Sequence, residues 1–283
     1  MQQLRIPNSN YMEKLILFGF AFFSISLNAQ INRVDHFFAS SPKAEKLFKL
    51  FKEKLELPVA WEYQNWGSFA SGGVSLGNIA FEFVSFDSLM KTKFDAIALE
   101  PRQSVEEFVL ILDSNQISHD SIEANTYKKK DGSIGGWSNL NLPNLLPKEV
   151  GIFICDYKQR EEVNIANRKD SAELVKRKGG PLGIISLKEI VINSTDVISS
   201  KIKLSKLPGI VIRNTALFSF NSGTSLRLKK STSSGIEKIV ILVNSLSKTK
   251  EYLKLNGLLE NSSNGIYMNS NAIEGLQIQF VDK

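Results

Sequence analysis

The chain has 283 residues, of which 42% are hydrophobic and 23% are charged, an ordinary globular composition. This length suits one large domain or two modest ones. The formal net charge is +6, but basic residues are spread along the chain, and the run 128–130 is followed directly by the turn residues Asp131 and Gly132. Without a recognition motif, this pattern indicates a solvated loop and argues against nucleic-acid binding.

The first thirty residues have the pattern of a secretory signal peptide. Lys14 precedes an apolar run that begins at Leu15 and fades towards Asn28 and Ala29. A positive start, a short apolar stretch and a small residue before the cut are typical of such a leader. The run is shorter than the roughly 20 apolar residues of a membrane span. We therefore predict a signal peptide over residues 1–29, with Met12 as the expected start. The mature protein is then secreted or periplasmic and has no stable membrane span.

The chain has a single cysteine, Cys155, so no disulfide can form within it. Cys155 lies in the apolar run 151–155. This setting indicates a buried structural thiol rather than a reactive one.

One pattern recurs four times after the leader: an apolar strand, a polar turn, an amphipathic helix, and short strands that end in another apolar run. In the first copy, the strand 31–39 is followed by Ser40, Ser41 and Pro42, which start a helix. The apolar residues of that helix follow a one-sided spacing and are Ala44, Leu47, Phe48, Phe51 and Leu55. Each copy is a βαβββ unit too small to bury its own sheet, so the units should pair.

These units predict an α+β protein of two halves, with mixed, mainly antiparallel sheets and helices outside. The predicted boundaries are half one at 30–157 (modules 31–86 and 93–157), a linker at 158–182, and half two at 183–283 (modules 183–230 and 235–283). The linker is rich in charge, which indicates a polar helix or a tether.

The stretch 73–77 fits the G-x-S-x-G pattern of a serine hydrolase, with Ser75 at its centre. That motif requires a helix directly after the serine. Residues 78–84 instead read as a strand, and nothing links His36 or His119, the two histidines, to Ser75. We therefore interpret Ser75 as a strand residue.

Glu82 is an acid inside the apolar run 78–84. In a strand, Phe81 and Phe83 point to one face and Glu82 to the other. A buried carboxylate needs a partner because desolvation alone costs several kcal/mol. His36, in an equally apolar strand, is the candidate partner, either as a satisfied core pair or as part of a functional site.

The first module resembles the vicinal oxygen chelate superfamily, the group of glyoxalases, bleomycin-resistance proteins and extradiol dioxygenases. The stretch Val34-Asp35-His36-Phe37 looks like the first strand of that fold, and residues 73–84 look like its closing strand. In this family these two strands are neighbours, and the positions of His36 and Glu82 carry metal ligands. The resemblance thus implies paired vicinal-oxygen-chelate-like halves.

Placing residues 80–83 over 154–157 brings Asp156 to the position of Glu82, while Ala96 falls at that of His36. The resemblance then implies a divalent metal (Fe, Mn, Zn or Ni) held by His36, Glu82 and Asp156. The same overlay in the second half gives Glu189 and Gln279 without any histidine. We expect that half to be a structural partner.

Aromatic and amide residues near these strands suggest a pocket wall for a mostly apolar ligand with polar handles. The candidate substrate-binding residues are Trp61, Tyr63, Trp66, Asn78, Trp137, Asn139 and Tyr157. The alternative is that the tryptophans fill the core.

The resemblance implies an exported glyoxalase-like protein that binds a small organic molecule through a divalent metal. Possible activities are those of a lyase, isomerase or dioxygenase, with Glu82 as a catalytic ligand or base. The alternatives are a metal-free binding or sequestering protein of bleomycin-resistance type, and an inert interaction module. A monomer and a homodimer both fit such units.

The leader gives the first testable prediction. N-terminal sequencing of the exported protein should begin at Gln30, because cleavage is expected after the small residue Ala29. A mature protein that begins at Met1 or Met12 would contradict the signal peptide.

Overall fold

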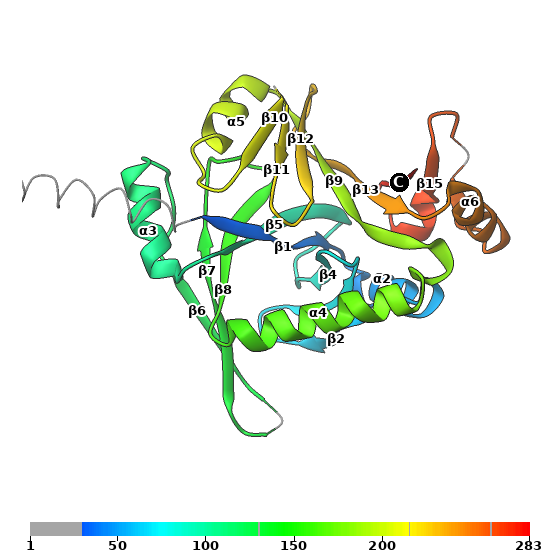
Figure 1. Cartoon of the computed structure of the whole chain (residues 1–283), viewed down its shortest axis with the longest axis horizontal. Helices are drawn as coiled ribbons and strands as arrows, with labels where there is room; N and C mark the ends of the chain where they lie inside the picture. Colours follow the sequence, from blue (N-terminus) through cyan, green and yellow to red (C-terminus); the bar gives the residue numbers. More distant parts are fainter. Residues whose placement is uncertain (1–29, 130, 215, 261) are drawn as a thin grey trace, which may run out of the picture.

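The computed structural model describes residues 30–129, 131–214, 216–260 and 262–283 (Figure 1). The predicted signal peptide at 1–29 lies outside the described residues. No helix in the described part of the chain is long and apolar enough to cross a membrane.

The chain forms two eight-stranded sheets, each built from two βαβββ modules. The first sheet has the strand order β2-β3-β4-β1-β5-β8-β7-β6, and the second has β10-β11-β12-β9-β13-β16-β15-β14. Within a module the first and last strands run parallel, and two modules meet along an antiparallel pair, β1 with β5 and β9 with β13. The predicted fold class is confirmed.

The elements of the first sheet are β1 (Ile31–Ser40), α2 (Ala44–Lys49) with the π-helical turn η1 (Leu50–Lys54), β2 (Val59–Asn65), β3 (Ala70–Ser75), β4 (Ala80–Ser85), β5 (Lys93–Pro101), α3 (Val105–Ser114), β6 (Glu123–Lys128), β7 (Ile134–Asn141) and β8 (Gly151–Tyr157). Helix α4 (Arg160–Lys176) and η2 (Gly180–Leu182) follow, in the predicted linker segment.

The elements of the second sheet are β9 (Ile184–Ser194), α5 (Val197–Leu204), β10 (Val211–Asn214), β11 (Leu217–Ser219), β12 (Ser225–Lys230), β13 (Gly235–Val243), α6 (Leu246–Leu255), β14 (Leu259–Glu260), β15 (Ile266–Met268), η3 (Ser270–Ile273) and β16 (Ile278–Asp282).

The period of two along β1 and β4 separates a core face from a concave face of the first sheet. On the core face, Phe37 stacks on Phe81 at 4.5 Å between ring centroids, and Phe51 of η1 lies 5.0 Å from Phe83. On the other face, His36 and Glu82 line a cavity. Burial of these phenylalanines against α2 and η1, worth about 2 kcal/mol each, therefore dictates that the polar pair faces the cavity.

Ser75 ends β3 and is buried, and its Oγ accepts a hydrogen bond from the Gly77 N–H. The chain then enters strand β4 rather than a helix, so Ser75 is a strand residue, as the sequence predicts. Cys155 is likewise buried and unpaired.

The turn between β3 and β4 joins the two halves of the protein. The Asn78 side chain accepts a hydrogen bond from the Leu187 N–H at 2.9 Å and donates to the Leu187 carbonyl at 3.0 Å and to Thr224 Oγ1 at 2.8 Å. Helix α4 also contacts this turn, because Ser171 Oγ donates to the Gly77 carbonyl. In Figure 1, α4 runs along the first sheet, close to β2.

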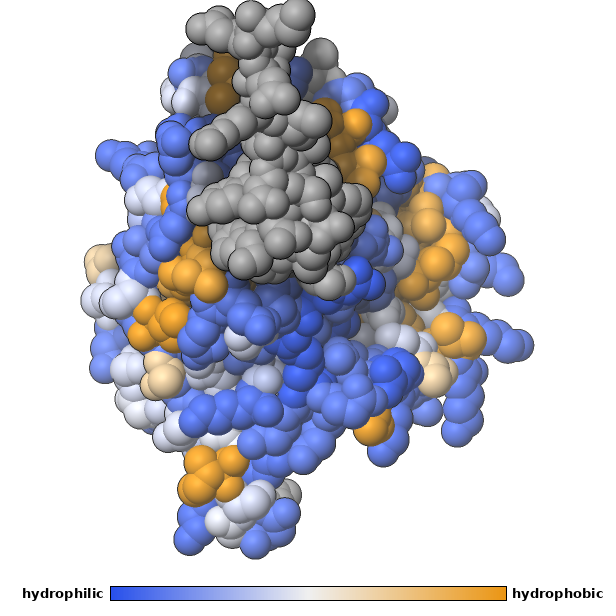
Figure 2. Space-filling model, turned by 60° about the vertical axis from the view of Figure 1, so that its left-hand side comes forward, coloured by the Kyte–Doolittle hydropathy of each residue, from blue (hydrophilic) through white to orange (hydrophobic). Residues whose placement is uncertain are grey.

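On the face drawn in Figure 2, the coloured surface is mostly hydrophilic and its apolar residues lie in separated patches. Exposed apolar side chains include Leu110 on α3 and Ile198 and Ile202 on α5. Single exposed apolar residues are normal for a soluble domain. The large apolar clusters of the described residues are therefore inside, in the core and the cavity.

The Asn78 contacts predict a measurable coupling of the two halves. Asn78→Ala leaves the N–H and carbonyl of the buried Leu187 without these partners, so the free energy of unfolding should fall by about 2 kcal/mol. Urea denaturation measures this loss, and Asn264→Ala, in an exposed loop, is the control and should change little. Equal stability of Asn78→Ala and Asn264→Ala would contradict the assigned role.

Candidate ligand-binding site

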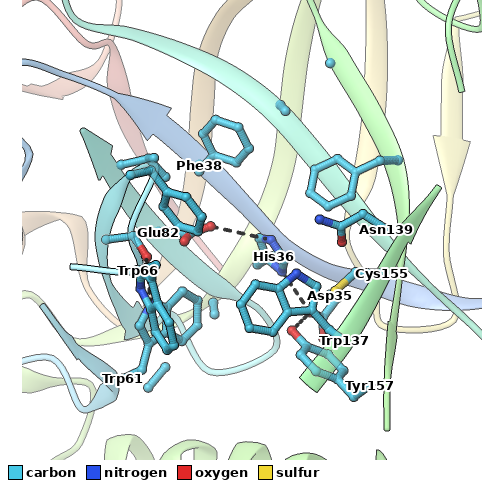
Figure 3. A pocket seen from close by; sticks show the side chains of 18 of the residues that line it. Asp35, His36, Phe38, Trp61, Trp66, Glu82, Trp137, Asn139, Cys155 and Tyr157 are labelled. Carbon is cyan, nitrogen blue, oxygen red and sulfur yellow. Dashed lines mark hydrogen bonds and ion pairs between the residues drawn. The ribbon is translucent and has the colours of Figure 1, made fainter. Parts of the chain in front are cut away.

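A cavity of about 600 Å³ occupies the concave face of the first sheet. Trp61 and Trp66 line it from the side of β2, and Trp137 and Tyr157 line it from β7 and β8 (Figure 3). Ala166 and neighbouring residues of α4 form another part of the wall. The cavity is therefore built from both modules of the first half and from the helix that follows them.

His36 is oriented by the residue that precedes it. Its Nδ1 lies 2.8 Å from Asp35 Oδ2, and its Nε2 lies 3.5 Å from Glu82 Oε2 (Figure 3). Consecutive strand residues usually face opposite sides, but the pairing of β1 with β5 shifts register between Val34 and His36. This irregularity allows both Asp35 and His36 to line the cavity.

Asp35 is the centre of a buried hydrogen-bond network. The Tyr157 hydroxyl donates to Asp35 Oδ2 at 2.7 Å, and Arg33 donates to Oδ1 at 2.9 Å. Burial alone would raise the pKa of Asp35, but the hydrogen bond and charge of His36, followed by the charge of Arg33, lower it below its usual value. Asp35 is therefore a fixed anion behind the imidazole.

The same hydrogen-bond network shifts the pKa values of His36 and Tyr157. Burial opposes a charge on His36, but the hydrogen bond and charge of Asp35 and the charge of Glu82 outweigh it and raise the pKa of His36. Burial and the Asp35 charge raise the pKa of Tyr157 well above its usual value, so its hydroxyl remains a donor.

Glu82 lies on β4 opposite His36, in a desolvated position. Burial raises its pKa, while the charge of His36 and a hydrogen bond with Ser71 act in the opposite direction without cancelling the effect. Ser71 Oγ also accepts the indole N–H of Trp66 at 3.1 Å. Because burial favours the protonated acid and Asp35 favours the protonated imidazole, His36 and Glu82 titrate as one coupled pair.

A glycine makes room for the aromatic wall. Gly73 on β3 pairs with Trp61 on β2, and a Cβ at Gly73 would lie 2.6 Å from the Trp61 ring. The Trp61 ring in turn meets the His36 ring edge-on, at 6.1 Å between centroids. Glycine at position 73 therefore leaves the space that the Trp61 ring occupies in the aromatic wall.

The structure corrects the predicted role of Asp156. Its carboxylate accepts a hydrogen bond from the Val105 N–H at the start of α3 and pairs with Arg160, away from His36 and Glu82. On β8 the residues that line the cavity are Gly151, Phe153, Cys155 and Tyr157. The overlay placed Ala80 on Ile154, whereas the strand pairing matches Ala80 to His36 and Gly151 to Ala96. It was therefore three residues out of register, and an odd shift moves a side chain to the opposite face of a strand.

The other predicted residues divide into two groups. Trp61, Trp66, Trp137, Asn139 and Tyr157 line the cavity. Two lie outside the lining: Asn78 binds the second half, and Tyr63 packs on Phe48 at 6.0 Å between ring centroids. The pairing of β2 with β3 shifts register after Trp61, so Tyr63 does not repeat its orientation.

Sequence reasoning missed several polar residues of the lining, which are Asp35, Ser71, Asp95, Glu123, Tyr127, Asn141, Cys155 and Asn167. Asp35 directly precedes His36 in the first strand, where strict alternation would place it on the opposite face. The one signal in the sequence was that Asp35 is directly next to His36, since a carboxylate beside an imidazole commonly orients the ring.

The donor set does not complete the predicted metal site. His36, with Nδ1 bound to Asp35 and Nε2 directed to Glu82, is oriented as a ligand imidazole would be. However, no group of three or more His, Cys, Asp and Glu side chains in the described part of the chain is arranged to hold a metal ion. A catalytic metal ordinarily requires three protein ligands. The residues present therefore do not fit such a centre.

The corresponding acid of the second half has a different environment. Glu189 on β9 forms a two-pronged ion pair with Arg227 on β12, with both contacts at 2.7 Å. Because Arg227 satisfies both carboxylate oxygens, Glu189 is explained as part of a structural pair.

Comparison with solved structures shows the fold of the chain. A hypothetical protein from Staphylococcus aureus has a TM-score of 0.59 at 11% identity, covering 89% of this chain and 99% of that one. The 2,3-dioxygenase LapB from Pseudomonas sp. KL28 has a TM-score of 0.58 at 8% identity, covering 90% and 93%. The E323L mutant of homoprotocatechuate 2,3-dioxygenase from Brevibacterium fuscum has a TM-score of 0.55 at 11% identity, covering 89% and 72%.

No protein-family model and no curated protein matches the sequence. At these low identities the structural likeness concerns the fold alone. The chain has the vicinal oxygen chelate fold, as its first module suggested.

The Asp35–His36 contact predicts a shift that NMR can measure without ambiguity, because the chain has only two histidines. Asp35→Asn removes the anion that stabilises the imidazolium, so the pKa of His36 should fall. His119, whose pKa is raised by the Asp120 carbonyl and Asp113, is the internal control and should not move. An unchanged His36 titration in a folded variant would contradict the network.

Proposed function

We propose that the chain binds a small, largely apolar, planar organic molecule in the cavity of its first half without a resident metal ion. The observation that supports this most strongly is an aromatic cavity with one polar cluster, Asp35, His36 and Glu82. A volume of about 600 Å³ falls within the range typical of small-molecule sites.

The aromatic walls would supply most of the binding free energy. The rings of Trp66 and Trp137 lie 5.7 Å apart and nearly perpendicular, and Phe153 meets His36 edge-on at 5.8 Å. Rings on several sides of one cavity favour a flat guest that stacks on one ring and meets the edges of others. This arrangement supports a planar ligand over a flexible polar one.

The polar groups would orient the ligand. His36 Nε2 and the Glu82 carboxyl both line the cavity, and Asn139 Oδ1 is buried there without a hydrogen-bond partner among the described residues. Buried polar atoms are rarely left unpaired, so this acceptor favours a ligand that carries a donor. The expected guest therefore has an apolar body and one or two polar substituents.

Dioxygenase activity is a property of two of the structural neighbours. The predicted metal dependence of this chain included Asp156, which lies elsewhere, and His36 and Glu82 alone make an incomplete ligand set. We therefore assign no reaction step to a metal. Export of the protein stays a proposal that rests on the leader sequence.

Acid–base catalysis on the bound molecule is a second candidate function, and the His36–Glu82 pair favours it. An ionised Glu82 beside a protonated His36 would take a proton from a carbon next to a carbonyl group. His36 Nε2–H would at the same time donate a hydrogen bond to the carbonyl oxygen and stabilise the developing enolate. Return of the proton to another carbon would complete an isomerisation. Exchange of ligand C–H for deuterium, absent in Glu82→Gln, tests this candidate.

Binding itself can be followed by intrinsic fluorescence, because all three tryptophans of the chain line the cavity. Screening a library of planar aromatic acids, amides, neutral compounds and amines should yield ligands that quench this fluorescence and raise the melting temperature. Trp137→Ala should weaken such ligands about tenfold, the equivalent of about 1.4 kcal/mol for a lost aromatic contact. Tyr267→Ala, on β15 of the second half, is the control and should retain full affinity.

Chelator treatment distinguishes this proposal from a metal-dependent one. Protein dialysed against EDTA should bind the same ligands with unchanged affinity. Absence of any ligand from the whole library would contradict a binding function, and loss of affinity that one equivalent of a divalent ion restores would contradict metal independence.

A further inference from the structure

The charges that line the cavity are unlike those of the whole chain. The chain has 35 Lys and Arg residues against 29 Asp and Glu residues. The cavity lining includes four carboxylates, Asp35, Glu82, Asp95 and Glu123, but no lysine or arginine among the described residues. A protein with a positive net charge thus has a binding cavity whose acidic groups outnumber its one basic residue, His36.

Two of these carboxylates are already neutralised by neighbouring cations. Asp35 contacts Arg33 and His36, and Asp95 pairs with Lys93 at 2.7 Å. Glu82 has His36 as its one cationic partner, and Glu123 forms no ion pair with any described residue. Glu82 lies deep in the cavity across from His36, and Glu123 lies exposed at its rim, so acidic groups are present at both levels.

Three aromatic rings of the cavity lining lie together. Trp66, Tyr127 and Trp137 form a three-ring box: Trp66 is nearly perpendicular to both other rings, at 5.6 and 5.7 Å between centroids, and Tyr127 lies 6.0 Å from Trp137. Ring faces attract cations through their quadrupoles, and aromatic boxes of this kind suit quaternary and protonated amines. The rings and the carboxylates therefore favour the same sign of charge on a ligand.

Other ligand charges fit less well. An anion would meet Glu82 and Glu123 and would have only His36 as a counter-charge. A neutral molecule would use the apolar walls but would leave the Glu123 carboxylate and the ring quadrupoles without a specific partner.

We propose that the cavity selects organic cations, that is, a planar aromatic body that carries a quaternary or protonated nitrogen held between the three-ring box and the two glutamates. This inference deepens the proposed small-molecule binding and rests on it.

A set of three molecules with nearly the same shape tests the selectivity. The cation 10-methylacridinium, its neutral carbon isostere 9-methylanthracene and the anion anthracene-9-carboxylate differ mainly in charge. Titrations followed by tryptophan quenching in low and high salt should show the cation binding at least tenfold more tightly than the neutral isostere. The anion should bind most weakly. High salt should reduce the preference for the cation, because Glu123 is exposed to screening.

The possible failures are distinguishable. Equal affinity for cation and neutral isostere, or tighter binding of the anion, overturns cation selectivity but leaves small-molecule binding intact. Absence of binding for all three, together with absence of any hit among the acids, amides and neutral compounds of the library, overturns both proposals.

Two matched variants locate the effect. Glu123→Gln removes one rim charge at an exposed position and should weaken the cation several-fold without changing the neutral isostere. Glu62→Gln, on β2 and paired with Lys52 outside the cavity, is the control and should change neither ligand. Rescue of cation affinity by Glu123→Asp supports the charge effect, whereas equal losses for both ligands in Glu123→Gln would contradict it.

Discussion

The hydrogen bond between Asp35 Oδ2 and His36 Nδ1 is the interaction on which the candidate site depends. It exists because an irregular register in the β1–β5 pairing allows two consecutive residues to reach the cavity. Arg33 and Tyr157 hold the carboxylate from two sides, so the imidazole is fixed by strands of both modules. The free Nε2 then faces Glu82, which the Phe81–Phe83 core face directs inward. The Asp35 hydrogen bond thus positions His36, and the apolar packing of the neighbouring phenylalanines positions Glu82.

Small residues complete this arrangement. Gly73 accepts the Trp61 ring, and Gly151 stands against Ala96, where a Cβ would lie 2.7 Å from the alanine methyl. Larger residues at these positions would displace the aromatic wall or separate β5 from β8, because packed interiors leave little free volume. The cavity is therefore a consequence of which strand residues are small, as much as of which are aromatic.

Most of the fold follows from local sequence patterns, because module periodicity and the Phe alternation around Glu82 are properties of single strands and helices. The register between paired strands is harder to predict from the sequence. Asp156 was placed on the wrong face by a three-residue error of register in the overlay, and Tyr63 by a register shift in β2. Asp35 was missed because alternation alone cannot reveal the irregular β1–β5 pairing. Asn78 looked like a ligand residue, yet its partners lie more than a hundred residues away in the second half.

His36 and Glu82 face each other as an acid–base pair in a ligand cavity rather than as two ligands of a resident metal. Metal analysis tests it most directly, on protein purified without chelator, exposed to Fe(II), Mn(II), Zn(II) and Ni(II) and then freed of unbound ions. A cavity without a resident metal should retain less than about a tenth of an equivalent of any of these ions, and His36→Ala should give the same value. One equivalent of a divalent ion in the wild type that disappears in a folded His36→Ala variant would contradict it.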